Sequence, residues 1–212
     1  PWSKFDSNYE APDGGRTLTY CAAIREAIDQ AMRLDPRVFA IGLDADDRFG
    51  VFGSMANLTH KERVLGTPIA ENAMTGVALG AALCGLRPIH VHLRNDFLLV
   101  AMDQIANYVA KWQDMFDHQP KVPLVIRSII GRGWGCGAQH SQSLHGLFAQ
   151  LPGLKVVMPS TPFDVKGLLL AAIADDSPVL FLEHRWLYKN TGNVPAAMYT
   201  LPLGKAAHLR TG

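Results

Sequence analysis

One acid stands in an otherwise apolar stretch of the chain, TPIAENAMTGVALGAALCGLRP, which covers residues 67–88. Glu71 follows a short apolar run and opens a predicted helix of small and apolar residues. A carboxyl group in such surroundings is favoured in its protonated form, so Glu71 is a candidate proton donor. The alternative is an acid of the first helical turn, which the helix dipole stabilises without any chemistry.

Two histidines, His90 and His92, alternate along a predicted strand and therefore share one of its faces. Two imidazoles fall short of the three or four ligands that a metal site needs. Their types and spacing favour a structural or substrate-facing role over a metal site.

A second candidate region is the loop GRGWGCGAQHSQ, residues 131–142, between a predicted strand and a predicted helix. It presents His140 at the helix start, where an imidazole can hydrogen-bond an anionic group or shuttle a proton. Gly133, Gly135 and Ala138 match a variant of the dinucleotide fingerprint, G-x-G-x-x-A, which leaves a nicotinamide-binding domain as one alternative. The next strand, LKVVMP, lacks the terminal acid that would hold a ribose, so a plain flexible turn is the other alternative.

Alternating helices and strands must position these residues. The predicted helix at 17–33 has alanine and isoleucine at helical spacing, and Thr17 or Thr19 could cap it. Further helices are predicted at 71–84, 96–116, 140–151 and 162–174, and strands at 38–43, 88–93, 123–130, 154–159 and 178–183. This pattern predicts an α/β fold, a doubly wound and mostly parallel sheet with helices on both faces. Such sheets bind ligands at the carboxyl ends of their strands, here the loops after Leu43, Leu93, Ile130 and Pro159.

The composition bounds the partners and the organisation of the chain. Its 212 residues, 48% hydrophobic and 18% charged, suit one sizeable α/β domain. A net charge of +1 gives no electrostatic case for nucleic acid or membrane, and no apolar run reaches the roughly 18 residues of a membrane span. Three widely spaced cysteines indicate free thiols in a reducing, cytoplasmic compartment. We expect a flexible N-terminal arm at 1–16, one domain at 17–188, and at 189–212 a linker towards a missing C-terminal domain.

Several motifs occur in a fixed order: TPIAENAMTG, GLRP, NDF, MDQI, AQHSQS, PGLKVVMPSTPFDVKGLL and DDSPVLFLEHRWLY. Together they resemble the beta subunit of the thiamine-diphosphate-dependent decarboxylase component of 2-oxo acid dehydrogenases, and more broadly the transketolase-like pyrimidine-binding domain. The resemblance covers about residues 17–190. It implies a thiamine diphosphate cofactor shared with a second subunit, because the GDG motif that binds magnesium and the diphosphate is absent from this sequence.

The resemblance also implies roles for individual residues. Glu71 occupies the position of the glutamate that hydrogen-bonds N1′ of the cofactor's aminopyrimidine, and Phe97 that of the aromatic residue stacked on this ring. Ile69 and Leu93 match apolar residues around the ring. His140 matches a histidine near the substrate and the entry of the acyl carrier.

Other positions depart from the family pattern or concern a metal. The family often has an acid where Leu43 stands, so Asp44, one place later, is the candidate for a further contact to the cofactor. The stretch HVHLRNDF is more basic than usual, and His90, His92 and Arg94 could therefore favour an anionic or sugar-like substrate over a simple 2-oxo acid. A structural potassium ion is implied by matches at Leu124, Ala172, Asp175 and Ser177.

The implied partner is an alpha-type subunit that carries the diphosphate and magnesium motif, in a two-plus-two assembly. Self-association and a lipoyl carrier protein are further implied contacts. The implied activity is decarboxylation of a 2-oxo acid or transfer of a ketol or acyl unit. Alternatives are a split transketolase acting on sugar ketols and a catalytically idle scaffold, although the presence of both Glu71 and Phe97 argues against the idle form.

Overall fold

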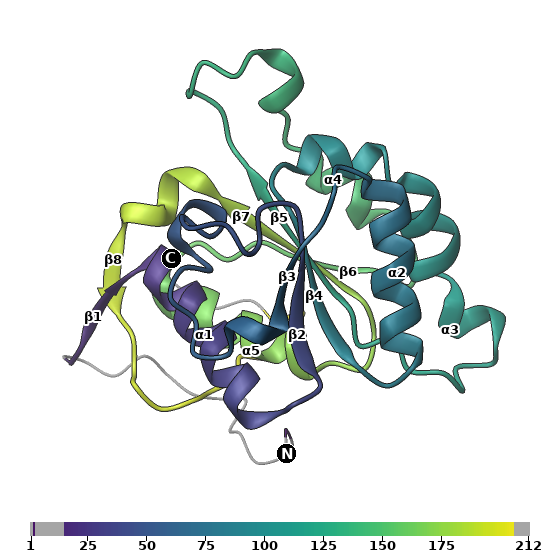
Figure 1. Cartoon of the computed structure of the whole chain (residues 1–212), viewed down its shortest axis with the longest axis horizontal. Coiled ribbons are helices and arrows are strands. Elements are labelled where there is room, and N and C mark those ends of the chain that lie inside the picture. Colours follow the sequence, from purple (N-terminus) through teal and green to yellow (C-terminus); the bar gives the residue numbers. More distant parts are fainter. Residues whose placement is uncertain (1, 3–14, 206–212) are drawn as a thin grey trace, which may run out of the picture.

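A six-stranded parallel sheet forms the centre of the computed structural model, which describes residues 2 and 15–205 (Figure 1). Its strand order is β3-β2-β4-β5-β7-β6, and a separate antiparallel pair joins β1 to β8. The strands are β1 (Thr17–Thr19), β2 (Val38–Gly42), β3 (Val64–Gly66), β4 (Arg87–His92), β5 (Val125–Ile130), β6 (Lys155–Val157), β7 (Val179–His184) and β8 (Thr191–Asn193). The α-helices are α1 (Tyr20–Leu34), α2 (Glu71–Leu83), α3 (Trp112–Met115), α4 (His145–Ala149) and α5 (Pro162–Ala174).

Helices cover both faces of this sheet. Helices α1 and α5 pack together on one face, whereas α2, α3 and α4 lie on the other (Figure 1). Strand β5 shows why two cores form: Val125 and Ile129 face the first, and Ile126 and Ile130 face the second. Each fully buried side chain of this size contributes about 1.5–3 kcal/mol. The predicted doubly wound α/β fold is therefore confirmed.

The first predicted helix, 17–33, begins later than expected. Thr17 to Thr19 form β1, and α1 starts at Tyr20. Thr19 caps the helix, since its hydroxyl accepts a hydrogen bond of 3.1 Å from the backbone N–H of Ala22. Pairing of β1 with β8 holds the preceding residues extended, which a local pattern could not reveal.

The prediction of one long helix at 96–116 is wrong. The structure has a 3-10 helix at Asn95–Leu99, a π-helix at Gln104–Val109 and the short α3. Asn95 and Asp96 bind the backbone of residues 142–144, and these contacts fix the start of the segment outside an α-helical path. The same contacts explain why the helix predicted at 140–151 is restricted to α4.

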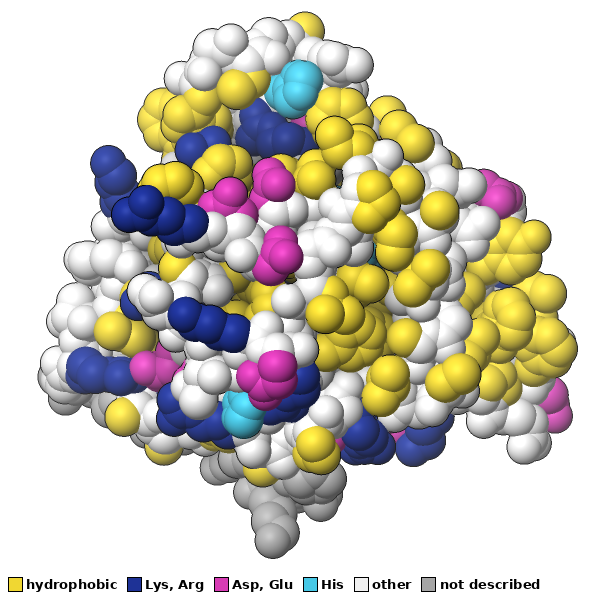
Figure 2. All heavy atoms as spheres, viewed as in Figure 1, with side chains coloured by type: hydrophobic (Ala, Val, Ile, Leu, Met, Phe, Trp, Pro, Cys, Tyr) yellow, Lys and Arg dark blue, Asp and Glu magenta, His cyan; other side chains and the backbone are white. Residues whose placement is uncertain are grey.

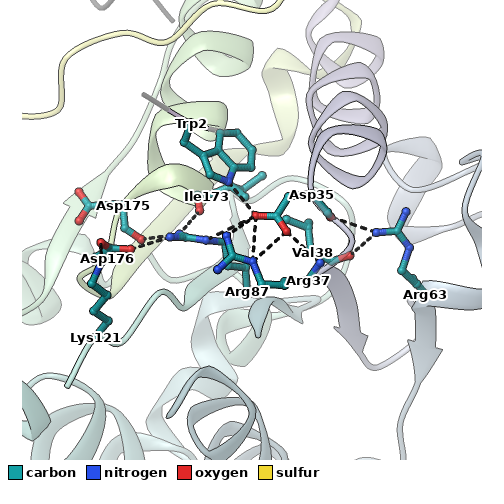
Figure 3. Close-up of polar contacts among 10 residues, drawn as sticks. All are labelled: Trp2, Asp35, Arg37, Val38, Arg63, Arg87, Lys121, Ile173, Asp175 and Asp176. Carbon is teal, nitrogen blue, oxygen red and sulfur yellow. Dashed lines mark hydrogen bonds and ion pairs between the residues drawn. The ribbon is translucent and has the colours of Figure 1, made fainter. Parts of the chain in front are cut away.

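A network of charges joins the amino ends of the strands (Figure 3). Arg87, at the start of β4, donates to the carboxylate of Asp176 and to the carbonyls of Ile173 and Asp175. The Arg37 guanidinium holds the pKa of the Asp35 carboxyl well below its usual range. These ion pairs fix the ends of α1 and α5 against β4, at the amino ends of the strands. The loops that the sequence predicts to bind a ligand lie at the opposite, carboxyl ends.

The predicted arm and linker are only partly described. Residues 1, 3–14 and 206–212 of these segments lie outside the described residues. The part of 189–212 that is described forms β8 and then follows α5, where the Tyr199 ring stacks on Phe163 with centroids 4.7 Å apart. Among the described helices, none is long and apolar enough to cross a membrane.

Candidate active site

A recess of about 40 Å³ lies at the carboxyl ends of β2 and β4. Strand β2 has β3 on one side and β4 on the other, so the strand order reverses at this point, where parallel sheets bind ligands. Four residues singled out in the sequence line the recess together: Glu71, Ile69, Leu93 and Phe97. They come from the loop before α2 and the loop after β4, which are far apart in the sequence.

Glu71 is the first residue of α2 and is half-buried at the recess. Its backbone carbonyl accepts a hydrogen bond of 2.7 Å from the Thr75 hydroxyl, one turn along the helix. Within the described part of the chain, no side chain or backbone N–H binds the Glu71 carboxylate. Both carboxylate oxygens are thus available to a ligand, in a wall that is otherwise largely apolar.

The floor of the recess contains His90 and His92, whose rings meet edge to face with centroids 4.4 Å apart. The Nε2 atoms of His90 and His92 lie 3.1 and 3.4 Å from the Thr75 hydroxyl oxygen, and the Nδ1 of His90 donates to the carbonyl of Ile41. Burial lowers the pKa of His90 to about 4 and holds that of His92 well below its usual range. Both rings are therefore neutral near pH 7 and contact the Thr75 hydroxyl, which donates to the backbone carbonyl of Glu71.

The walls are aromatic and apolar. Phe97 is half-buried and meets the His140 ring edge to face, with centroids 5.0 Å apart, so His140 stands beside the recess. Ile69 is 76% exposed, which leaves one wall open to solvent or to another chain. Asp44 is exposed, has a left-handed backbone (φ 54°) and is not among the residues that line the recess.

Sequence reasoning missed the way in which Arg94, Asn95 and Asp96 hold the loop that carries His140. Asn95 accepts from the Leu144 N–H and donates to the Gln142 carbonyl, and Asp96 accepts from the Gln142 N–H. Arg94 donates to the carbonyls of Gly131 and His140, at the two ends of the glycine-rich loop. The available signal was the polar run RNDF directly after an apolar strand.

A buried ion pair that the sequence analysis also missed supports the loop after β2. The guanidinium of Arg127 on β5 binds the carboxylate of Glu183 on β7 and the hydroxyl of Ser54, and Tyr188 donates to the same carboxylate at 2.7 Å. Each of the two charged residues interrupts an otherwise apolar strand, VIRSII and VLFLEH, which was the signal for a buried pair. Through Ser54 this pair fixes the loop that follows β2.

The four residues of the implied potassium site lie near the amino ends of the strands, where the oxygen atoms of Asp175 already bind cationic side chains. Lys155 pairs with the Asp175 carboxylate, which also accepts a 2.9 Å hydrogen bond from the Ser177 N–H. Arg87 donates to the Asp175 carbonyl at 3.1 Å. Among the described residues, no group of three or more His, Cys, Asp or Glu could hold a metal ion.

The glycine-rich loop lacks the geometry of a dinucleotide site. Gly133 and Gly135 have left-handed backbones, and only a three-residue 3-10 helix, Ala138–His140, follows them. A pyrophosphate site of this type needs the N-terminus of a full helix directly after the glycines. The resemblance to G-x-G-x-x-A therefore has no structural counterpart here.

The recess fits one half of the implied cofactor. A flat heterocycle with hydrogen-bonding nitrogens at its rim needs apolar walls, an aromatic face and a polar partner for a ring nitrogen. Leu93, Ile69 and Phe97 supply the first two, and the unpaired carboxylate of Glu71 supplies the third. The recess is small and open on the side of Ile69, so the rest of a cofactor would extend beyond this chain.

Comparisons with known proteins agree with this geometry. The chain is 46% identical to the acetoin:2,6-dichlorophenolindophenol oxidoreductase subunit beta of Cupriavidus necator, over 93% of this chain and 62% of that protein. It is 44% identical to the 2-oxoisovalerate dehydrogenase subunit beta of Bacillus subtilis, over 92% of this chain and 61% of the relative. The chain thus spans about three fifths of the length of the curated relatives that it matches.

A solved structure and a family profile complete the comparison. The structure, described as a split gene transketolase, inactive beta4 tetramer, has a TM-score of 0.64 and 19% identity, and the match covers 79% of this chain and 51% of the other; it shows the fold alone. The family described as transketolase, pyrimidine binding domain, matches residues 16–191. The chain belongs to this family of transketolase pyrimidine-binding domains.

Proposed function

We propose that this chain acts as the beta-type subunit of a thiamine-diphosphate-dependent enzyme that decarboxylates a 2-oxo acid or transfers a ketol or acyl unit. The observation that carries the proposal is the unpaired carboxylate of Glu71 in an apolar recess at the point where the strand order reverses. The names of the relatives, which are beta subunits of acetoin and 2-oxo acid enzymes, support the same assignment.

Thiamine diphosphate, when bound, supplies a thiazolium carbanion that attacks a carbonyl carbon. In the proposal, Glu71 holds a proton at N1′ of the aminopyrimidine. Ile69, Leu93 and Phe97 orient the ring and exclude water from it. His140, beside Phe97, moves a proton to or from the substrate, while Asp44 is left for a contact farther along the cofactor.

We assign the remaining half of the site to an alpha-type partner subunit that holds the diphosphate and its magnesium ion. Large apolar side chains are exposed around the recess and along α2, among them Leu65, Ile69, Val77, Leu99 and Val100. Figure 2 shows hydrophobic side chains gathered over the half of the molecule that contains α2 and α3. A surface of this kind is typical of a protein interface.

Further contacts and the compartment are part of the same proposal. Self-association would complete a two-plus-two assembly, and a lipoyl carrier would approach His140 at the mouth of the recess. The described cysteines, Cys21, Cys84 and Cys136, are free thiols, as expected in the cytoplasm.

A structural potassium ion at Leu124, Ala172, Asp175 and Ser177 is a separate proposal, which rests on the resemblance. Such an ion would compete with Lys155 and Arg87, which already bind oxygens of Asp175. Melting temperature in potassium chloride and in sodium chloride at equal ionic strength tests it. A higher value in potassium supports the ion, and equal values remove it.

The main experiment replaces Glu71 by Gln in the chain assembled with an alpha-type partner and cofactor. Loss of a general acid lowers turnover by about 10²–10⁴-fold, while the assembled particle should stay intact. Glu62→Gln is the matched control, because Glu62 is an exposed acid outside the recess. Full turnover of Glu71→Gln would contradict the assigned role. Activity on sugar ketols alone would favour the split transketolase, and no turnover by the wild type would favour the idle scaffold.

A further inference from the structure

Arg94 is a buried cation in the wall of the recess. The residue is 7% exposed and lines the recess directly after β4. One guanidinium nitrogen, Nη2, donates to the carbonyls of Gly131 and His140, whereas the buried Nη1 has no hydrogen-bond partner. Within the described residues, no carboxylate lies within 4 Å of this guanidinium.

The other buried arginines of the described chain, Arg87 and Arg127, also have one buried nitrogen each without a hydrogen-bond partner, so the missing carboxylate is what distinguishes Arg94. Arg127 binds the carboxylate of Glu183, and Arg87 binds that of Asp176 at 2.6 Å. Buried charges in proteins are normally paired, because an isolated ion in a poorly polarisable interior is costly. Arg94 departs from this pattern, and it does so at the recess.

The neighbouring titratable groups do not supply the counter-ion. Asp96 is buried nearby, but its oxygens accept from the Gln142 N–H and the Asn95 side chain. His90 and His92 are neutral near pH 7, since burial lowers the pKa of each. Glu71 shares the recess without an ion pair to Arg94, and the proposed function assigns its carboxylate to the cofactor ring.

We propose that Arg94 is the counter-ion for an anionic acyl donor, so that this site selects a 2-oxo acid carboxylate over a neutral hydroxyketone. The inference rests on the proposed function and narrows it, since the relatives include both an acetoin enzyme and a 2-oxoisovalerate enzyme. Among the described residues, the Trp134 ring faces the Arg94 guanidinium, with its centroid 6.0 Å from the guanidinium carbon, but no carboxylate does. The cation therefore attracts an anionic donor in the recess and leaves a neutral donor of similar size unaffected. The competing view is that Arg94 only braces the loop at 131–140.

Two variants distinguish the effect of the positive charge of Arg94 from the effect of its structural contact with the loop at 131–140. Arg94→Lys keeps the positive charge but lacks the planar fork, whereas Arg94→Gln keeps an N–H donor for a carbonyl and removes the charge. With the assembled holoenzyme, kcat/KM is measured for 2-oxoisovalerate, pyruvate and acetoin. The wild type should prefer the carboxylate donors. Arg94→Gln should lower their kcat/KM relative to that of acetoin by about tenfold or more, and Arg94→Lys should keep the ratio within about threefold. Equal losses on charged and neutral donors in both variants would overturn the inference.

A binding measurement keeps the test independent of turnover. Oxamate, a carboxylate shaped like pyruvate, is titrated calorimetrically into the same holoenzyme, with neutral oxamide as the reference. Arg94→Gln should weaken oxamate binding at least tenfold, and Arg48→Gln, at an exposed arginine outside the recess, should not change it. Equal affinity of the wild type for oxamate and oxamide refutes the inference even if Arg94→Gln fails to fold. If the protein binds oxamate more tightly than oxamide but turns over no donor, the proposed function is contradicted and the anion site at Arg94 is supported.

Discussion

Replacement of His90 tests the floor of the recess through the pH dependence of folding. This imidazole is 2% exposed, and burial lowers its pKa to about 4, from an ordinary value near 6.5. Between these two values the unfolded chain binds a proton that the folded chain refuses. The folded state therefore loses stability as the pH falls from about 6.5 to about 4, and the loss levels off below the folded pKa.

The magnitude follows from the two pKa values. Linkage gives a loss of about 2 kcal/mol in the free energy of unfolding between about pH 7.5 and about pH 5. His92, whose pKa is lowered by burial and then by His90, adds a loss of the same sign. The pKa values of Asp35 and Asp176 are lowered by their arginine and lysine partners, so these carboxylates stay ionised over this range and do not contribute.

Urea unfolding of the wild type and of His90→Asn at both pH values measures this loss. Asparagine has an amide N–H with which to bind the Ile41 carbonyl but does not titrate, so the variant's loss on acidification should be smaller by about 2 kcal/mol. Its absolute stability at neutral pH is not the readout. His118→Gln, at a histidine with 73% of its side chain exposed, should keep the wild-type pH dependence. Identical pH dependence in the wild type and His90→Asn would refute the reasoning, because His90 would then titrate freely in the folded chain.

Two further predictions concern the buried ion pair and the interface. Arg127→Met should lower the free energy of unfolding by about 3–5 kcal/mol, and adding Glu183→Leu should restore part of it, which a denaturant double-mutant cycle measures; no recovery would contradict simple pairing. Gly80→Arg places a large cation on the exposed face of α2, where an added Cβ meets no atom within 4 Å. It should leave the melting temperature of the chain nearly unchanged and prevent assembly with the alpha-type partner in size-exclusion chromatography, whereas normal assembly would exclude this face from the interface.

The sequence predicts most of this fold because its strands are short apolar runs. Every strand of the six-stranded sheet except β3 was expected, and β2, β4, β5 and β7 show the apolar runs that burial on both faces produces. β3 was missed because VLG contains only two adjacent apolar residues, whereas β6, also a short edge strand, lies in the longer run LKVVMP. The interrupted segment at 96–116 could not be predicted, because its course is set by bonds from Asn95 and Asp96 to residues more than forty positions away.

The recess also combines features that the sequence predicts with features that depend on long-range contacts. Glu71, Ile69, Leu93 and Phe97 come together because they follow β3 and β4, the two parallel strands on either side of β2. For the contacts that hold the His140 loop, the sequence contains only the polar run RNDF after an apolar strand. The neutral state of His90 depends on its burial in the folded chain, which no local pattern reveals. Asp44 is not among the residues that line the recess, so its contact with the cofactor stays a prediction.

The amino and carboxyl ends of the parallel strands differ in whether their charged side chains have counter-ions, and this difference indicates where a ligand binds. At the amino ends of the strands, the buried guanidinium of Arg87 has the carboxylates of Asp35 and Asp176 as counter-ions. At the carboxyl ends, Glu71 and Arg94 each lack a counter-ion within the described chain. Charged side chains have counter-ions at the amino ends of the strands, so the absence of counter-ions at the carboxyl ends calls for an explanation. Bound ligands explain it best: a ring nitrogen as the partner of the Glu71 carboxylate, and an anion as the partner of the Arg94 guanidinium.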